Sequence, residues 1–264
     1  MVSTMAWAKD WKKHFRWLLP LAFWLGVWQL VGWLVERSVA GRGNELLLPY
    51  PATVLAALSR LVVTAAFWRS VAASLLRIFG GLAAGVAVGA ALAALTGAFR
   101  WANLLLAPAI RVVRATPVAS FILLILLWTS RDAVPVIVSA LMVVPVVWET
   151  VSEGIAATDE KLLEMAGAYR FSRWKTIRLI YLPSIKPYFS AALINAVGLA
   201  WKSGSAAEVL CVPKQAIGSR IYQAKLYLEI PELFAWTVTV VCLSGLLEKG
   251  LSVILRRQKG GGLP

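Results

Sequence analysis

Histidine and cysteine are scarce in this chain, and their scarcity excludes several classes of function. The 264 residues include one histidine, His14, and two cysteines, Cys211 and Cys242. Residues so few and so widely spaced offer no metal-ligand spacing, no disulfide framework and no histidine-based catalytic centre. We therefore expect no metal site and no enzyme of these kinds.

Charge is scarce as well. Charged residues make up 15% of the chain, whereas an average soluble domain has about 25%. Hydrophobic residues make up 59% and are gathered in long runs, which is typical of a membrane protein. The phosphate-binding pattern G-x-x-x-x-G-K-[ST] is also missing, so we do not expect this chain to bind ATP.

The charges that are present are mostly positive, with a formal net charge of +14. A nucleic-acid-binding protein could have such a charge, but no nucleic-acid-binding motif accompanies it. The basic residues instead flank the apolar runs, as expected of residues that orient membrane helices. Lys and Arg are more numerous in the segments assigned to the cytoplasm, which predicts that both termini are cytoplasmic.

The apolar runs predict an all-α, polytopic fold with six transmembrane helices. The third run is short and contains Pro117, so together with 102–114 it predicts one broken or bent helix. An amphipathic stretch at 51–66 predicts a helix at the membrane interface. The expected spans are 17–35, 72–96, 115–129, 133–148, 188–209 and 233–255.

These spans divide the chain into three parts. Residues 1–16 form a cytoplasmic N-terminal segment, 17–255 the transmembrane domain, and 256–264 a cytoplasmic tail. Within the domain, 150–187 forms a long cytoplasmic loop with a short helix expected near 160–170. The loop either docks into a groove on a soluble subunit or binds anionic lipid headgroups, and composition alone does not separate the two.

Small residues recur every four positions along the second span, at Gly81, Gly85, Gly89, Ala93 and Gly97. On a helix they form one stripe that lets another helix approach closely. We expect Gly81, Gly85 and Gly89 to pack against a neighbouring helix, either in the same subunit or across a dimer.

Polar residues inside the spans are costly in hydrocarbon, so they should face protein or water. We expect a translocation pathway near the external mouth, formed mainly by the fifth span with part of the third. Lys202 has a simpler alternative, in which its amine reaches the outer membrane interface. The candidate pathway residues are Arg77, Asn195, Lys202, Ser205 and Glu208.

The cytoplasmic loop carries a long-range motif. The triplet Glu164-Met165-Ala166 is followed at a fixed distance by Ile180-Tyr181-Leu182-Pro183. This resembles the Glu-Ala-Ala loop of bacterial ABC-importer permeases: Glu-Ala-Ala, three residues, Gly, nine residues, Ile, one residue and Leu-Pro. Met165 replaces the first Ala of that pattern and Arg170 replaces its Gly, while nearby Gly167 could supply the lost backbone freedom. The resemblance assigns ATPase coupling to Glu164, Met165, Ala166, Gly167, Arg170, Ile180, Leu182 and Pro183.

Further motifs appear in the order found in permeases of the nitrate, sulfonate and taurine group. L-L-P-Y-P-A-T-V near residue 50 resembles that group's Pro-x-Pro entry. The other matches are Ser74-Leu75-Leu76-Arg77 followed by Gly81, Pro108 followed by Thr116-Pro117, and A-A-E-V-L at 206–210 followed by Ile217-Gly218.

The resemblance implies the MetI-like architecture of a permease subunit in a binding-protein-dependent ABC importer of the cell inner membrane. It implies a second permease copy, expected to be identical, ATPase subunits that bind ATP and Mg, and an extracytoplasmic substrate-binding protein. The solute would be a small anion such as a sulfonate, taurine or nitrate; a thiamine precursor or another small organic solute is the alternative. A membrane-embedded enzyme and a structural membrane anchor are the rival classes.

Overall fold

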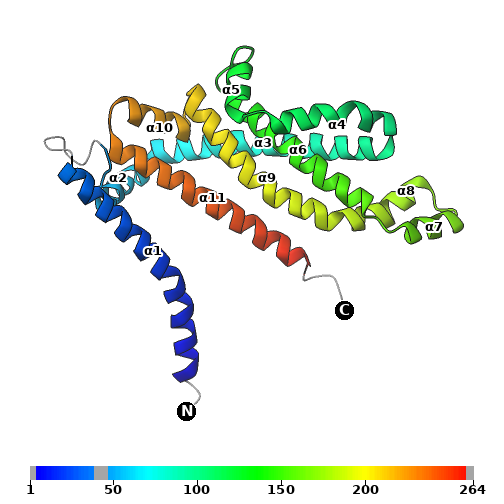
Figure 1. Ribbon diagram of the computed structural model, residues 1–264, viewed down its shortest axis with the longest axis horizontal. Coiled ribbons are helices and arrows are strands. Elements are labelled where there is room, and N and C mark those ends of the chain that lie inside the picture. The colour runs from blue at the N-terminus through cyan, green and yellow to red at the C-terminus, as the bar shows by residue number, and fades with distance from the viewer. Residues whose placement is uncertain (1–3, 39–46, 260–264) are drawn as a thin grey trace. The chain divides into compact units, whose positions relative to one another are not determined.

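Helices make up the regular structure of the described residues, which are 4–38 and 47–259 of the computed structural model (Figure 1). Side chains are described from Leu19 to Ile254, apart from 39–46, so those of the predicted segments 1–16 and 256–264 lie outside this part. The chain divides into two compact units. One comprises 1–67 with 223–238, and the other comprises 68–222 with 239–264.

The first unit contains α1 (Thr4–Ser38), α2 (Pro51–Val62) and the start of α11 (Ile230–Lys259). Pro51 occupies the first turn of α2, where its missing N–H would have had no helical partner. Aromatic rings join the elements, with the Trp28 and Phe234 centroids 5.7 Å apart and Phe67 stacked on Trp236 at 4.9 Å. The stretch 51–66, which we predicted to form a helix, is helical from Pro51 as far as Val62.

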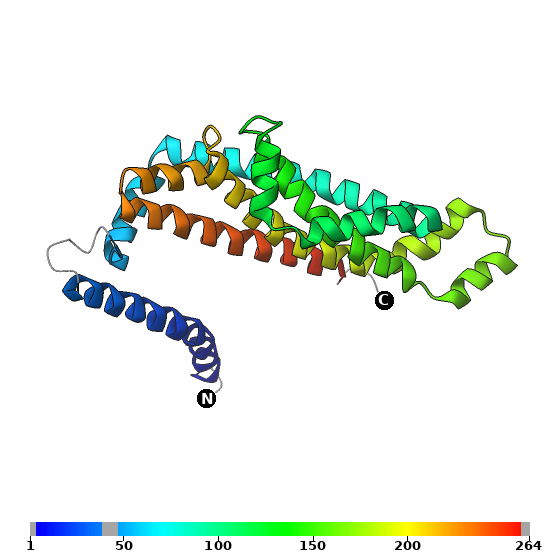
Figure 2. The same cartoon turned by 45° about the horizontal axis from the view of Figure 1, so that its top comes forward.

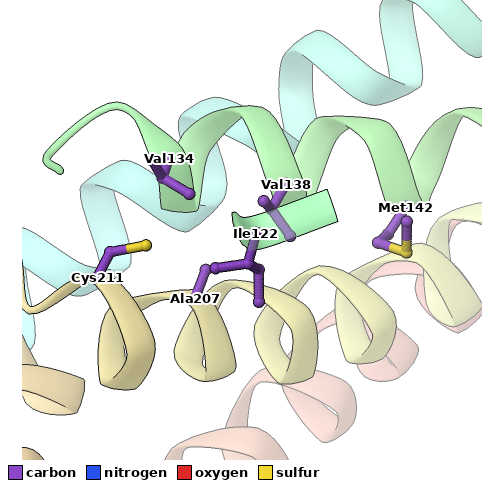
Figure 3. Close-up of a cluster of buried hydrophobic side chains, with 6 residues drawn as sticks. All are labelled: Ile122, Val134, Val138, Met142, Ala207 and Cys211. Atoms are coloured by element: carbon purple, nitrogen blue, oxygen red, sulfur yellow. The ribbon is translucent and has the colours of Figure 1, made fainter. Parts of the chain in front are cut away.

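The second unit is built around α6 (Val134–Ala156) and α9 (Leu182–Cys211), which pack along each other (Figures 1 and 2). Ile122 of α5 (Val118–Leu126) lies between Val138 on α6 and Ala207 on α9 (Figure 3). Inside a membrane such contacts stabilise through close packing, because lipid tails are as apolar as the side chains. The buried cluster consists of Ile122, Val134, Val138, Met142, Ala207 and Cys211.

Four helical segments are long and apolar enough to cross a membrane: Leu19–Ser38, Ala65–Ala98, Val134–Ala156 and Ile230–Ile254. α4 (Arg100–Ala115) and α5 are long and apolar enough only when they are taken together, and the chain bends by 101° between them. The pair can therefore form a fifth, broken span. This confirms the prediction of a bent third helix. The bend falls at Thr116 and Pro117, whose extended backbone interrupts the helical hydrogen bonding.

The predicted fifth span, 188–209, lies within α9, a helix of 30 residues. α9 is long enough to cross a membrane, but it is not among the segments that also meet the apolar criterion. The polar residues Lys202, Ser203, Ser205 and Glu208 in its last third explain this. All six predicted apolar runs thus lie on helices, and α9 is the one with a polar end.

Three glycines of α3 (Ala65–Ala98), Gly81, Gly85 and Gly89, lie directly against the backbone of α6. A Cβ atom added at Gly85 would lie 2.7 Å from the Ala140 carbonyl oxygen, and one at Gly89 2.9 Å from that of Val144. A Cβ at Gly81 would meet the Val136 carbonyl oxygen more closely still. The neighbour of this stripe is therefore a helix of the same chain.

Candidate functional site

The loop between α6 and α9 contains the predicted short helix, α7 (Glu160–Ala168). Asp159 precedes it as the N-cap, and its carboxylate accepts a 2.9 Å hydrogen bond from the Lys161 amide. An acidic N-cap also interacts favourably with the positive end of the helix. The helix expected near 160–170 is therefore confirmed, with ends set by local chemistry.

Arg170 ends α7 in a left-handed conformation, with φ of 51°. The Phe171 amide donates to the Ala166 carbonyl at 2.9 Å, and the Arg170 amide donates to the Gly167 carbonyl at 3.0 Å. These two bonds form a Schellman motif, in which glycine is the usual left-handed residue. Arg170 therefore adopts a glycine conformation at the position where the permease pattern has Gly.

Gly167 does not supply the backbone freedom that we expected of it. It lies within α7, and a Cβ atom added there would meet nothing within 4 Å. Its φ is not in the left-handed region; among the non-glycine residues described, that region is occupied by Arg170, Val212, Gln215 and Leu228. The turn depends on Arg170 itself.

The apolar residues of α7 divide between two faces. Ala166 is buried and Leu163 half-buried, whereas Leu162, Met165 and Tyr169 are exposed at 40%, 43% and 74%. The spacing i, i+3, i+7 places the exposed three on one stripe. Glu164 is also exposed. We name Leu162, Met165 and Tyr169 the α7 stripe.

After α8 (Arg173–Thr176) the chain passes through a π-helical turn, Ile177–Tyr181, into α9. Pro183 has no N–H to donate, and its ring would clash with the Leu179 carbonyl in a regular α-helix, so a wider turn relieves the clash. Ile180 is buried and Leu182 is exposed. The Ile-x-Leu-Pro part of the motif is therefore the joint between the loop and α9.

Glu208, near the end of α9, is fully buried. Its Oε2 accepts a 2.7 Å hydrogen bond from Ser74 Oγ on α3 and a 3.2 Å bond from the Gly218 amide. Ser74 Oγ in turn accepts a 2.9 Å bond from the Ile217 amide. The carboxylate thus joins α3 and α9 to the first turn of α10 (Ile217–Leu226).

Arg77 extends this network over the segment between α9 and α10. Its guanidinium lies 3.8 Å from Glu208 Oε1 and 3.2 Å from Asp132 Oδ1. It donates to the backbone carbonyls of Lys214 at 2.5 Å and Gln215 at 3.3 Å. Asp132 Oδ1 accepts a 2.9 Å bond from the Lys214 amide. Arg77 and Glu208 thus face protein groups of their own chain, and we do not propose them as pathway residues.

Glycine allows the two segments to approach each other here. A Cβ atom added at Gly218 would lie 2.5 Å from the Val209 amide nitrogen and 2.6 Å from the Glu208 carbonyl carbon. The residues of three separate sequence motifs, at 74–77, 206–210 and 217–218, therefore meet in one network. Asp132 also contributes to this network, and we did not predict it from the sequence. The signal that could have identified it is an acidic residue in a short turn between two apolar runs.

The other predicted pathway residues lie along α9. Asn195 and Lys202 are both exposed, and their seven-residue spacing places them on one side of the helix. Ser205 is half-buried. Asn195 and Lys202 therefore lie on a face of α9 that no other part of the described chain covers.

Among the cavities formed by described residues, two lie within the second unit. One, of about 340 Å³, lies between α4 and α6; its lining includes Arg111, Arg114, Glu149, Ser152 and Glu153. The other, of about 350 Å³, is apolar and lies beside the π-helical joint. Its lining is Ala94, Gly97, Ala98, Ile155, Ile177, Tyr181, Leu182 and Ile185.

Comparison with known proteins identifies the family. The profile of the binding-protein-dependent transport system inner membrane component matches residues 81–255, which include the coupling motif, α9 and most of α11. This chain belongs to that family. It is a transport subunit of an ABC importer, not an enzyme.

Relatives support the same group. SsuC of Bacillus subtilis (strain 168), whose name describes an aliphatic sulfonates transport permease, is 24% identical over 94% of this chain and 89% of its own length. The taurine transport system permease protein TauC of Escherichia coli (strain K12) is 25% identical over 90% and 86%. The bicarbonate transport system permease protein CmpB of Synechococcus elongatus is 26% identical over 90% and 88%.

Solved structures share the fold. A chain of the bacterial ABC transporter for the acidic polysaccharide alginate has a TM-score of 0.62 at 16% identity, over 95% of this chain and 96% of that one. A chain of the inward-facing MetNI methionine ABC transporter has a TM-score of 0.55 at 18% identity, over 77% and 96%. The predicted MetI-like permease fold is confirmed.

Proposed function

We propose that this permease imports a small anionic solute of the sulfonate or taurine kind across the inner membrane, with both termini in the cytoplasm. Two relatives of nearly full-length coverage are named for aliphatic sulfonates and taurine, and a third for bicarbonate. Each of the three names refers to a solute with an anionic group, a sulfonate in the first two and bicarbonate in the third. The exposed ammonium of Lys202 on α9 supports this class of solute through Coulomb attraction.

Coupling to an ATPase subunit is assigned to α7. The single observation that carries this proposal is the α7 stripe, three large apolar side chains exposed beside Glu164 on a helix whose two ends are firmly capped. Large exposed apolar side chains on a short rigid helix fit a groove on a soluble partner. The partner would bind ATP and Mg, since this chain has no phosphate-binding loop.

The joint at the end of the loop supports a mechanical role. Residues Ile177–Tyr181 form a π-helical turn directly before Pro183, and an apolar cavity of about 350 Å³ lies beside it. Such turns are often found at functional sites, because the looser hydrogen bonding lets a helix shift. Movement of α7 with the ATPase would reach α9 through this joint, so that nucleotide binding shifts the permease between two states.

A second, identical permease copy would complete the pathway. Asn195 and Lys202 lie on an uncovered face of α9. Polar groups on such a face would be costly against lipid, by about 2.5–3.5 kcal/mol for a central charge. Facing the same helix of a second copy across a water-filled path removes that cost. An extracytoplasmic binding protein would deliver the solute at the end opposite α7.

Reconstitution tests this function. The permease, an ATPase subunit that associates with it and a substrate-binding protein are placed in proteoliposomes, and uptake of labelled taurine, alkanesulfonates and bicarbonate is measured. We expect ATP-dependent uptake of at least one anion and ATP hydrolysis that the loaded binding protein accelerates. A chain that binds no ATPase, or binds one without any change in hydrolysis, would contradict the proposal.

A further inference from the structure

The cavity between α4 and α6 differs from the rest of the second unit in its charge. Two arginines and two glutamates line it, Arg111 and Arg114 from α4 and Glu149 and Glu153 from α6. The cavity has a volume of about 340 Å³, which falls within the range of small-molecule sites. Its formal charges cancel, so a simple net attraction for anions is not what this arrangement provides.

Of the two Arg–Glu pairs among the described residues of the cavity, one forms an ion pair and the other does not. Arg114 and Glu149 form an ion pair across the cavity. One helical turn further along each helix, Arg111 and Glu153 stand at matching levels, because α4 and α6 run antiparallel here. Neither forms an ion pair within 4.0 Å with any described side chain. Among the described side chains, the cavity thus presents an exposed cation, Arg111, and an exposed anion, Glu153, which come from different helices and form no ion pair.

A polar group on α6, next to Glu153, also lacks a partner among the described residues. Ser152 Oγ is buried and makes no hydrogen bond to any described group, and Ser152 lines the same cavity. Leaving a buried hydroxyl without a partner is unfavourable, so such groups commonly contact a ligand or water. The lining also includes Pro145 and Trp148, whose indole N–H is already bonded to Thr96 Oγ1 at 2.9 Å.

We propose that this cavity is a solute subsite for a small zwitterion, with Arg111 binding the anionic group, Glu153 the ammonium group and Ser152 a polar atom between them. A guanidinium binds a carboxylate or sulfonate through parallel hydrogen bonds. A carboxylate on the opposite wall attracts an ammonium and repels an anion-only solute. A molecule with both charges at its two ends satisfies both walls, whereas a plain anion leaves Glu153 without a partner.

This inference rests on the proposed function, because it takes its candidate solute from the sulfonate and taurine class proposed there. It adds a selectivity that the function does not require: a solute with an amino group should be preferred over the same solute without one. Taurine and ethanesulfonate make the comparison, since they share a two-carbon sulfonate and differ by the ammonium. Ethylammonium supplies the cation alone.

The test is equilibrium binding of labelled taurine to the purified permease–ATPase complex in nanodiscs, without the binding protein, with ethanesulfonate and ethylammonium as competitors. We expect taurine to bind at least tenfold more tightly than either competitor. Arg111→Gln should abolish taurine binding, and Glu153→Gln should weaken taurine to the level of ethanesulfonate. Arg111→Lys should restore part of the binding. Arg100→Gln, an exposed arginine at the start of the same helix, is the matched control and should leave binding unchanged.

Three results would overturn the subsite: equal binding of taurine and ethanesulfonate in the wild type, unchanged taurine binding in both variants, or no binding of any probe. ATPase association and ATP hydrolysis of the purified complex are measured as well, and they distinguish failure of the subsite from failure of the proposed function. If the ATPase co-purifies and hydrolyses ATP in all variants while the probes fail to discriminate, the subsite alone is refuted. If no ATPase associates with the wild-type chain, the proposed function fails first.

Discussion

Ser74 Oγ donates a 2.7 Å hydrogen bond to Glu208 Oε2, although the two residues lie 134 positions apart in the chain. The same carboxylate oxygen accepts from the Gly218 amide, and Arg77 lies within ion-pair distance of the other oxygen. One buried side chain therefore holds α3, α9 and the start of α10 together. Its loss should affect stability more than any single contact of the exposed helix faces.

Glu208→Ala should lower the thermal unfolding midpoint, because it leaves the Ser74 hydroxyl and the Gly218 amide without their acceptor. An unsatisfied buried group costs about 1–3 kcal/mol. Glu208→Gln should lose clearly less, since its amide oxygen can still accept both bonds. Unfolding of the detergent-solubilised protein, followed by tryptophan fluorescence, measures the difference. Equal midpoints for Ala, Gln and the exposed control Glu229→Ala would argue against the network.

Gly81→Ala and Gly80→Ala should have opposite effects, although the residues are neighbours. A Cβ at Gly81 would clash with the Val136 carbonyl oxygen, whereas one at Gly80 would meet nothing within 4 Å. Overpacking costs about 1–3 kcal/mol, and replacing an unconstrained helical Gly with Ala gains about 0.5–1 kcal/mol. Unfolding midpoints of the two variants provide the measurement. A tolerated Gly81→Ala would mean that α3 and α6 are further apart than described.

Arg170→Gly should stabilise the end of α7 by about 1 kcal/mol, because Gly adopts the left-handed conformation without the Cβ penalty. Arg170→Ala removes the same charge but keeps the Cβ, so it should give no such gain. Amide hydrogen exchange at Phe171 reports the stability of the Schellman bond to Ala166. Faster exchange in the glycine variant than in the alanine variant would contradict this account. Transport should be retained in Arg170→Gly.

Glu164→Lys should uncouple transport from ATP hydrolysis while leaving the protein in the membrane. Glu164 is exposed beside the α7 stripe, and reversing its charge would oppose any basic partner group in the docking groove. The expected result is at least a tenfold loss of uptake with altered ATPase association. Glu229→Lys, an exposed glutamate before α11, is the control. Full transport with normal ATPase association in Glu164→Lys would refute the docking assignment.

Single cysteines at 195, 202 and 205 should react with water-soluble thiol reagents, and their rates should change with nucleotide. Asn195 and Lys202 are exposed on α9 and Ser205 is half-buried, so reactivity should be highest at the first two. The native Cys242 is exposed and is replaced by Ser in the background, whereas Cys211 is buried and can stay. Protection of all three positions in every nucleotide state would place this face against protein or lipid.

Much of the fold could be predicted from local sequence. The lengths of the apolar runs located the membrane helices, because a span must satisfy its backbone within one helix of about 20 residues. Pro117 near the start of a short apolar run predicted the bent α4–α5 pair, and the spacing from Glu164 to Leu182-Pro183 located the loop that contains α7. These features depend on neighbours within a few turns, so the order of residues contains the information.

Other features depended on contacts between distant segments. Ser74-Leu75-Leu76-Arg77, Glu208 and Ile217-Gly218 were three separate motifs in the sequence, and only the packing of α3 against α9 brought them to one carboxylate. The stripe at Gly81, Gly85 and Gly89 predicted a close neighbour but did not name it, since any helix can enter such a groove. The left-handed turn at Arg170 was hidden too, because a non-glycine residue adopts it only when hydrogen bonds from Arg170 and Phe171 back into α7 offset its local strain.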